Sequence, residues 1–146
     1  MNAVLALSPE DRFSVVDIIH KFYLLVDSGR ASETASLFTA DAELTFGPGS
    51  PKPGTINGEE IAAAMRDRER LADVTTRHVI SNIALSSGEE ARIGAHYLIT
   101  LFRADGGPRT TLPAFVADVD EAFLNTPEGW KIAERTITPV FFRHGT

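Results

Sequence analysis

Apolar residues in the first part of the chain follow a helical rhythm. Between Ser8 and Gly29 they recur at steps of three and four residues in two adjacent rows, the spacing of a helix that buries a wide face. Ser8 can cap the first turn, Pro9 is tolerated at the first helical position, and Gly29 ends the pattern. A shorter amphipathic stretch follows at 32–38. The pattern predicts a long helix and then a short one.

A third helix signal follows a segment that is irregular for part of its length. Residues 42–46 alternate weakly between apolar and polar positions, and residues 47–54 are rich in glycine and proline, which predicts a loop. Asn57 can then cap a helix with glutamates in its first turn, and the helical pattern ends near residues 72–73.

From residue 74 onward the chain reads as strands separated by turns. The four predicted strands span residues 75–86, 91–103, 110–124 and 130–142. Strands of this length in a small protein must twist and bend. Helices followed by an antiparallel meander predict an α+β fold, with N-terminal helices packed on a strongly curved sheet around one core. Residues 1–146 are therefore expected to form a single domain.

Composition narrows the function classes. The chain of 146 residues has a formal net charge of −6 and a pI of about 5.1, the wrong sign for binding phosphates, so no nucleic-acid partner is expected. No apolar stretch reaches the ~18 residues that a membrane helix needs, so no membrane partner is expected either. The chain has no cysteine, which excludes disulfides and thiolate chemistry and favours a cytoplasmic location.

Histidine and carboxylate side chains supply the candidate chemistry. His78 and Asn82 lie an even number of residues apart on the first long predicted strand, so they point to the same face. If the helices cover that face, both point inward beside the end of the first helix, where Asp27 lies. A carboxylate bonded to one ring nitrogen of a histidine leaves the other nitrogen free as a general base. The spacing leaves open whether Asp27 meets His78 or ends the helix in water.

The other polar candidates favour structural interpretations. His20 lies on a largely apolar helix face and His96 on a strand face, where packed or half-exposed histidines are common, and His144 belongs to a basic tail. Glu121 belongs to an acidic cluster at 118–121 that is typical of a solvated strand edge. The four histidines lack the spacing of metal ligands, so no metal is expected.

Several short motifs together resemble the SnoaL-like branch of the nuclear transport factor 2-like superfamily. They lie at residues 22–29, 37–42, 54–61, 77–82 and 129–132, and the likeness covers nearly the whole chain. The resemblance implies a cone-shaped α+β barrel of the cystatin-like type. Members similar to scytalone dehydratase, bile-acid dehydratase and hexachlorocyclohexane dehydrochlorinase use an aspartate at the end of the first helix and a histidine on the first long strand. Asp27 and His78 match those two positions.

The match to individual members is uneven. Tyr23 approximates a tyrosine that some members place near the aspartate, and Asn82 matches an asparagine that follows the histidine by four. Steroid isomerases of this fold use a tyrosine and a carboxylate at positions that here hold Phe22 and Phe46. The second histidine of the fungal dehydratase corresponds to Phe102. The residues therefore favour a simpler base-driven elimination or isomerisation.

The resulting prediction is a cofactor-independent lyase or isomerase that acts on a small, mostly apolar, ring-containing molecule in an enclosed pocket. Asp27 and His78 would carry the proton transfer, and Tyr23 and Asn82 would hold the substrate. Apolar residues are expected to supply the walls of the pocket: Phe22, Phe46, Met65, Leu112, Phe115 and Phe141. No cofactor is expected.

A different class of function stays open. The same fold serves as a non-catalytic small-molecule-binding or dimerisation module, which needs a cavity but no hydrogen-bonded dyad. A homodimer is expected in either case, because Val79, Ile83 and Leu85 fall on the predicted outer face of the sheet, where a monomer would expose them.

Overall fold

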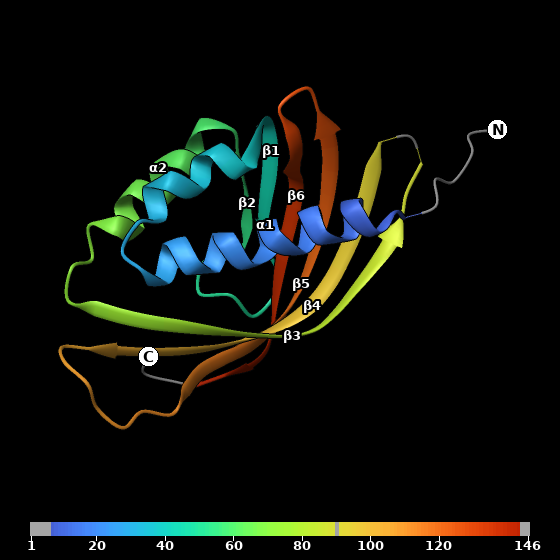
Figure 1. Ribbon diagram of the computed structural model, residues 1–146. Helices are drawn as coiled ribbons and strands as arrows, with labels where there is room; N and C mark the ends of the chain where they lie inside the picture. The colour runs from blue at the N-terminus through green and yellow to red at the C-terminus, as the bar shows by residue number, and fades with distance from the viewer. Residues whose placement is uncertain (1–6, 90, 144–146) are drawn as a thin grey trace.

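The computed structural model describes residues 7–89 and 91–143, so His144 lies outside the described residues. The helices lie on one side of a curved sheet (Figure 1). The helices are α1 (Pro9–Asp27), the 3-10 helix η1 (Ala31–Leu37) and α2 (Glu59–Glu69). The strands are β1 (Phe38–Phe46), β2 (Gly54–Asn57), β3 (Val74–Ser87), β4 (Arg92–Asp105), β5 (Pro113–Thr126) and β6 (Gly129–Phe142).

One six-stranded sheet contains all the strands, in the order β2-β1-β6-β5-β4-β3. Strands β3 to β6 form the antiparallel meander expected from the sequence, while β1 pairs in parallel with β6. Register shifts interrupt all three pairings of the meander, and such bulges bend a strand and increase its twist. The α+β fold with helices packed on a curved sheet is therefore confirmed.

Helix α1 crosses the sheet and buries one side against it (Figure 1). The Ser8 side chain accepts a hydrogen bond of 3.1 Å from the backbone of Asp11, as a capping serine does. At the other end Gly29 has φ of 76°, a left-handed conformation that suits glycine after a helix. Val15 and Ile19 are among the residues of its buried face. The local signals and the apolar pattern therefore agree on this helix.

The short strand β2 differs from the sequence prediction. Gly54 was expected to end a loop and Asn57 to cap the next helix, but residues 54–57 pair with β1. Gly58 is the N-cap of α2, and the backbone of Asn57 instead donates to the Glu60 carboxylate at 3.3 Å. Pairing with an open strand edge has overridden a local sequence that favours a turn.

A bulge in β3 overturns part of the predicted alternation. The register shifts between Ser81 and Ala84, and Asn82 takes a positive φ of 58°. Before the bulge the even-numbered positions are the less exposed ones, and after it the odd-numbered ones are, so Ile83 and Leu85 pack against the core. The prediction that these two residues form an outer apolar patch is therefore wrong.

The core fills the space between the helices and the concave side of the sheet. Its fully buried members include Ile19 of α1, Ile61 of α2, Tyr97 of β4 and Phe123 of β5. Among the described residues, no helix combines the length and the apolar character that crossing a bilayer requires.

Candidate active site

Asp27 and His78 meet where the end of α1 packs on β3. The Asp27 carboxylate lies 2.8 Å from Nδ1 of His78 and accepts the backbone N–H of His78 at 2.8 Å through its other oxygen. Only 12% of the His78 side chain and 11% of the Asp27 side chain are exposed. The two residues are 51 positions apart, so the packing of α1 across β3 creates the pair.

Further hydrogen bonds fix the charge state of Asp27. The Thr76 hydroxyl donates to it at 2.8 Å and in turn accepts a 2.9 Å bond from Arg68 of α2. Burial raises the pKa of Asp27, but the hydrogen bonds from His78 and Thr76 outweigh it and lower the pKa below its ordinary value. An ionised carboxylate only accepts hydrogen bonds, so Nδ1 of His78 must carry a proton. In the neutral ring, Nε2 is then free to accept one.

A second polar cluster lies beside the dyad and is buried. Arg135 donates to the Tyr23 hydroxyl at 2.7 Å, to the Tyr97 hydroxyl at 3.1 Å and to Glu121 at 3.1 Å. Tyr97 donates to Glu121, and the two tyrosine hydroxyls are 3.1 Å apart. The Tyr23 ring packs on the ring of His78 with centroids 4.8 Å apart. The cluster that contains the Arg135–Glu121 ion pair therefore lies next to the Asp27–His78 dyad.

Burial sets the protonation of this cluster. It raises the pKa of both Tyr23 and Tyr97, which therefore stay neutral hydroxyls at neutral pH. Burial also works against the charge on Arg135, but the two tyrosines and Glu121 around it raise its pKa well above the ordinary value. The guanidinium lies 4.4 Å from the ring centroid of Phe22 as well. Arg135 is consequently a fixed positive charge inside the protein.

A cavity of about 310 Å³ lies among α1, α2 and the sheet, and we call it the inner cavity. His78, Thr76, Tyr23 and Arg135 are among its polar lining. Its apolar lining consists of Phe22, Val26, Leu44, Phe46, Ala64, Met65, Ile99, Leu101, Phe115 and Ile137. Arg103 lines it too and is exposed, so the cavity opens to solvent there.

Five of the eight residues predicted to hold the substrate or to form the pocket walls do line the inner cavity. Phe22, Tyr23, Phe46, Met65 and Phe115 line the inner cavity. The other three expected lining residues do not: Asn82, Leu112 and Phe141.

The three displaced residues have different physical reasons. Asn82 is exposed because the bulge in β3 turns it away from the cavity. Leu112 and Phe141 are 63% and 69% exposed and border a shallow surface hollow near the end of β6. The prediction that Asn82, Leu112 and Phe141 line the pocket is therefore wrong.

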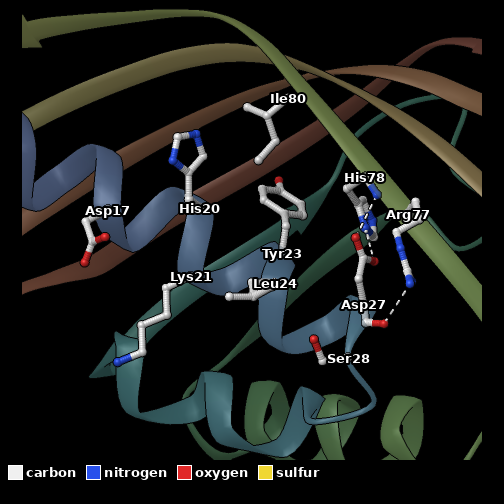
Figure 2. Close-up of a pocket in the computed structure, with 10 residues that line it drawn as sticks. All are labelled: Asp17, His20, Lys21, Tyr23, Leu24, Asp27, Ser28, Arg77, His78 and Ile80. Carbon is white, nitrogen blue, oxygen red and sulfur yellow. Dashed lines mark hydrogen bonds and ion pairs between the residues drawn. The ribbon is translucent and has the colours of Figure 1, made fainter.

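A second space borders the dyad from outside. This outer groove of about 660 Å³ lies between α1 and β3 and is drawn in Figure 2. His20 and Lys21 of α1 and Ile80 of β3 line it, together with Asp27. Tyr23 and His78 line both spaces. The groove has exposed walls, whereas the inner cavity offers a mostly buried apolar surface, which is the better environment for an apolar ligand.

The chain matches the SnoaL-like domain over residues 8–136. It belongs to the SnoaL-like domain family. This family includes polyketide cyclases and dehydratases. No curated protein matches the SnoaL-like chain in sequence.

Solved structures share the fold of this SnoaL-like domain. A protein from Novosphingobium aromaticivorans, described as NTF2-like with a cystatin-like fold, has a TM-score of 0.73 at 23% identity, covering 94% of this chain and 84% of its own. A candidate scytalone dehydratase from the same organism has 0.76 at 14%, covering 94% and 89%. A protein from Catenulispora acidiphila in complex with S-DNPA has 0.73 at 17%, covering 90% and 95%. At these identities the likeness concerns the fold.

Four residues of the SnoaL-like site were not among those predicted from the sequence. Thr76 shares a strand face with His78, so strand alternation could have identified it. Glu121 lies on the same face of β5 as the buried Val119 and Phe123 and is itself 5% exposed, so its assignment to a solvated edge is wrong. Arg135 is a charged residue in the middle of a predicted strand, and a charge at such a position can signal a buried partner of opposite charge. Nothing local indicates that Arg68 of α2 reaches Thr76.

The other described histidines, His20 and His96, do not line the inner cavity. His96 is half-exposed on the outer sheet face, with Nδ1 2.8 Å from Asp120, and His20 lines the outer groove. Across residues 7–89 and 91–143, no three histidine, cysteine, aspartate or glutamate side chains form a group suited to a metal ion.

Proposed function

We propose that this protein is a cofactor-independent lyase or isomerase that moves a proton of a small, mostly apolar, ring-containing molecule bound in the inner cavity. The observation that carries the proposal is the 2.8 Å contact between Asp27 and Nδ1 of His78, beside a cavity whose walls are mostly apolar. A histidine held this way presents one basic nitrogen. The hydrogen bond to Asp27 and the Tyr23 ring packed on the imidazole hold it in one orientation.

In the proposed reaction, Nε2 of His78 takes a proton from a carbon of the ring. The electron pair of the broken C–H bond forms a double bond, either by expelling a leaving group from the next carbon or by moving charge onto a conjugated carbonyl oxygen. The imidazolium then returns the proton to the departing hydroxide, giving water, or to another carbon; when a halide ion leaves, the imidazolium gives the proton to solvent. Asp27 stabilises the imidazolium through its negative charge and holds the ring in place.

The buried cluster offers electrostatic support for the developing charge. Tyr23 and Arg135 line the inner cavity, and Arg135 stays positively charged there. A fixed positive charge and hydroxyl near a growing oxyanion lower its energy without reorganisation. These two residues are therefore proposed to face the electron-accepting part of the substrate.

The family also supports chemistry on ring molecules. It includes polyketide cyclases and dehydratases, and a structural neighbour binds the small molecule S-DNPA. The proposed ligand is accordingly a small organic molecule rather than a nucleic acid or a membrane.

Replacing His78 tests the proposal. A panel of hydroxy- and halo-substituted ring compounds is first screened with the natural chain for release of water or halide, or for a change in absorbance. His78→Asn should then lower kcat by about 1,000-fold or more, because the general base is lost. The matched control is His20→Asn, a histidine of the outer groove, which should keep activity. Circular dichroism of both variants checks folding.

Two results would count against the proposal. Full activity in folded His78→Asn would remove the dyad from the mechanism. Binding of panel compounds without any turnover would instead favour the non-catalytic binding module.

The homodimer expected from the sequence stays a prediction. Of its three outer-face residues only Val79 remains exposed, at 52%, so the apolar surface that motivated it is smaller than expected. Sedimentation velocity at micromolar concentrations tests it, and a single monomeric species would contradict it.

A further inference from the structure

Positive charge gathers where the inner cavity opens, although the chain as a whole carries a net charge of −6. Arg68 and Arg103 line the cavity itself. Arg77, Arg103 and Arg109 line an adjoining hollow of about 330 Å³, which shares Thr76 and Arg103 with the cavity. The opening therefore has a basic rim inside an acidic protein.

Strand pairing places the two cavity arginines near one point. Arg103 of β4 is the register partner of Thr76 in β3, and Arg68 donates to the Thr76 hydroxyl at 2.9 Å. Burial and the positive charge of Arg103 both lower the pKa of Arg68. Like charges thus converge from α2 and β4 at the cavity opening.

These two arginines lack the acidic partners that their neighbours have. Arg66 of α2 and Arg70, the residue just after it, form ion pairs with Glu59 and Asp67 of that helix. Within the part of the chain that the structure describes, no ion pair involves Arg68 or Arg103. The acid that acts on Arg68 is Asp27, whose oxygens already accept bonds from Thr76 and His78.

Other acidic residues near the opening do not neutralise Arg68 or Arg103. Asp73 precedes β3 and Asp105 ends β4, and both are exposed. Neither forms an ion pair with Arg68 or Arg103 among the described residues. Two converging guanidinium groups at the end of an apolar cavity are suited to an anion attached to an apolar body.

We infer that the molecule bound in the inner cavity carries a carboxylate, which Arg68 and Arg103 hold at the opening while its ring packs against Phe46, Met65 and Phe115. The inference rests on the proposed function for the identity of the site. A guanidinium donates two parallel hydrogen bonds to a carboxylate, and partial burial strengthens the charge interaction.

The same geometry orients the substrate. Thr76, which contacts Arg68, and His78 lie two residues apart on one face of β3, or about 6.6 Å along the strand. A carboxylate at the arginines therefore lies on a different part of the molecule from the carbon that His78 deprotonates. The arginines set binding and orientation, and His78 sets the chemistry.

Isothermal titration calorimetry with matched unreactive probes tests the inference. The probes are 2-naphthoate and its neutral analogue 2-naphthamide. The natural chain should bind the carboxylate about tenfold or more tightly than the amide. In Arg103→Gln this preference should fall to about threefold or less with amide affinity unchanged, and Arg68→Gln should do the same. Arg66→Gln, an exposed arginine on α2, is the matched control and should keep the preference.

Three outcomes would overturn the inference. The first is equal affinity for the two probes, or no binding of either at millimolar concentration. The second is a carboxylate preference that survives in both Arg103→Gln and Arg68→Gln. The third is tighter binding of 2-naphthyl phosphate than of 2-naphthoate with the same dependence on the arginines, since that would assign the rim to a phosphate.

The design separates this inference from the proposed reaction. The probes have no leaving group, so their binding does not depend on turnover by His78. If the natural chain shows no carboxylate preference but His78→Asn is inactive, the carboxylate inference is wrong and the proposed reaction is still supported. If the carboxylate preference depends on the arginines but His78→Asn is fully active, the proposed reaction is wrong and the carboxylate site is still supported.

Discussion

At the scale of single residues, Asp27 is expected to act through His78. Asp27→Asn removes the negative charge that stabilises the imidazolium, and the amide can donate to Nδ1, which favours the wrong tautomer. We expect kcat to fall by about 100-fold or more, with a smaller change in KM. Steady-state kinetics on a substrate from the panel measures this. Unchanged kcat in a folded variant would show that the carboxylate is only a helix-end residue.

The lowered pKa of Asp27 also predicts how stability depends on pH. Because the pKa in the folded state lies below the ordinary value of 3.8, ionised Asp27 stabilises the fold above that value, and the contribution is lost as the pH falls through the folded pKa. The stability advantage of the natural chain over Asp27→Asn should shrink as the pH falls below about 4, where Asp27 becomes protonated. Urea unfolding at several pH values measures it. A difference independent of pH down to acid unfolding would contradict the ionised state.

The residues of the site were predictable to different degrees. The end of a helix and the alternation of a strand are local patterns, so Asp27 and His78 were within reach of the sequence. Their contact was not, because it depends on the path of α1 across β3. Arg68 was out of reach for the same reason, since no periodicity records which strand a helix end meets.

At the scale of elements, the bulge in β3 decides the role of Asn82. A positive φ costs most side chains about 1 kcal/mol or more, while glycine adopts it freely. Asn82→Ala should therefore destabilise the protein by about 1 kcal/mol, and Asn82→Gly should change stability by less than about 0.5 kcal/mol. Because Asn82 is exposed, Asn82→Gly should keep the activity of the natural chain. Thermal unfolding and kinetics measure both.

The alternative role of Asn82 gives the opposite kinetic result. If its amide held the substrate, Asn82→Gly would raise KM even though the backbone tolerates glycine. Strict alternation along β3 predicts that role, and it fails at the bulge because one extra residue reverses the faces beyond it. A bulge depends on pairing with β4, so the sequence of β3 alone does not reveal it.

At the scale of the whole molecule, the order of helices and strands was predictable and the polar interior was not. The periodicities mark which segments are helices and strands, and long strands with a helical cover imply a curved sheet. Strand β2 and the parallel pairing of β1 with β6 arise from contacts across the sheet. The buried cluster likewise draws its members from α1, β4, β5 and β6, so it exists only once the fold is complete.

That cluster predicts a non-additive effect on stability. Arg135→Met leaves the Glu121 carboxylate buried without its cation and should lower the free energy of unfolding by about 3–5 kcal/mol. Adding Glu121→Gln removes the uncompensated charge, so the double variant should recover about 1 kcal/mol or more relative to Arg135→Met. Urea unfolding of the two single variants and the double variant completes the cycle. A double variant as unstable as the sum of the singles would mean that the charges of Arg135 in β6 and Glu121 in β5 do not stabilise each other. The recovered double variant should still lack the positive charge beside Tyr23, so regained stability without regained turnover would assign Arg135 to the reaction as well as to the fold.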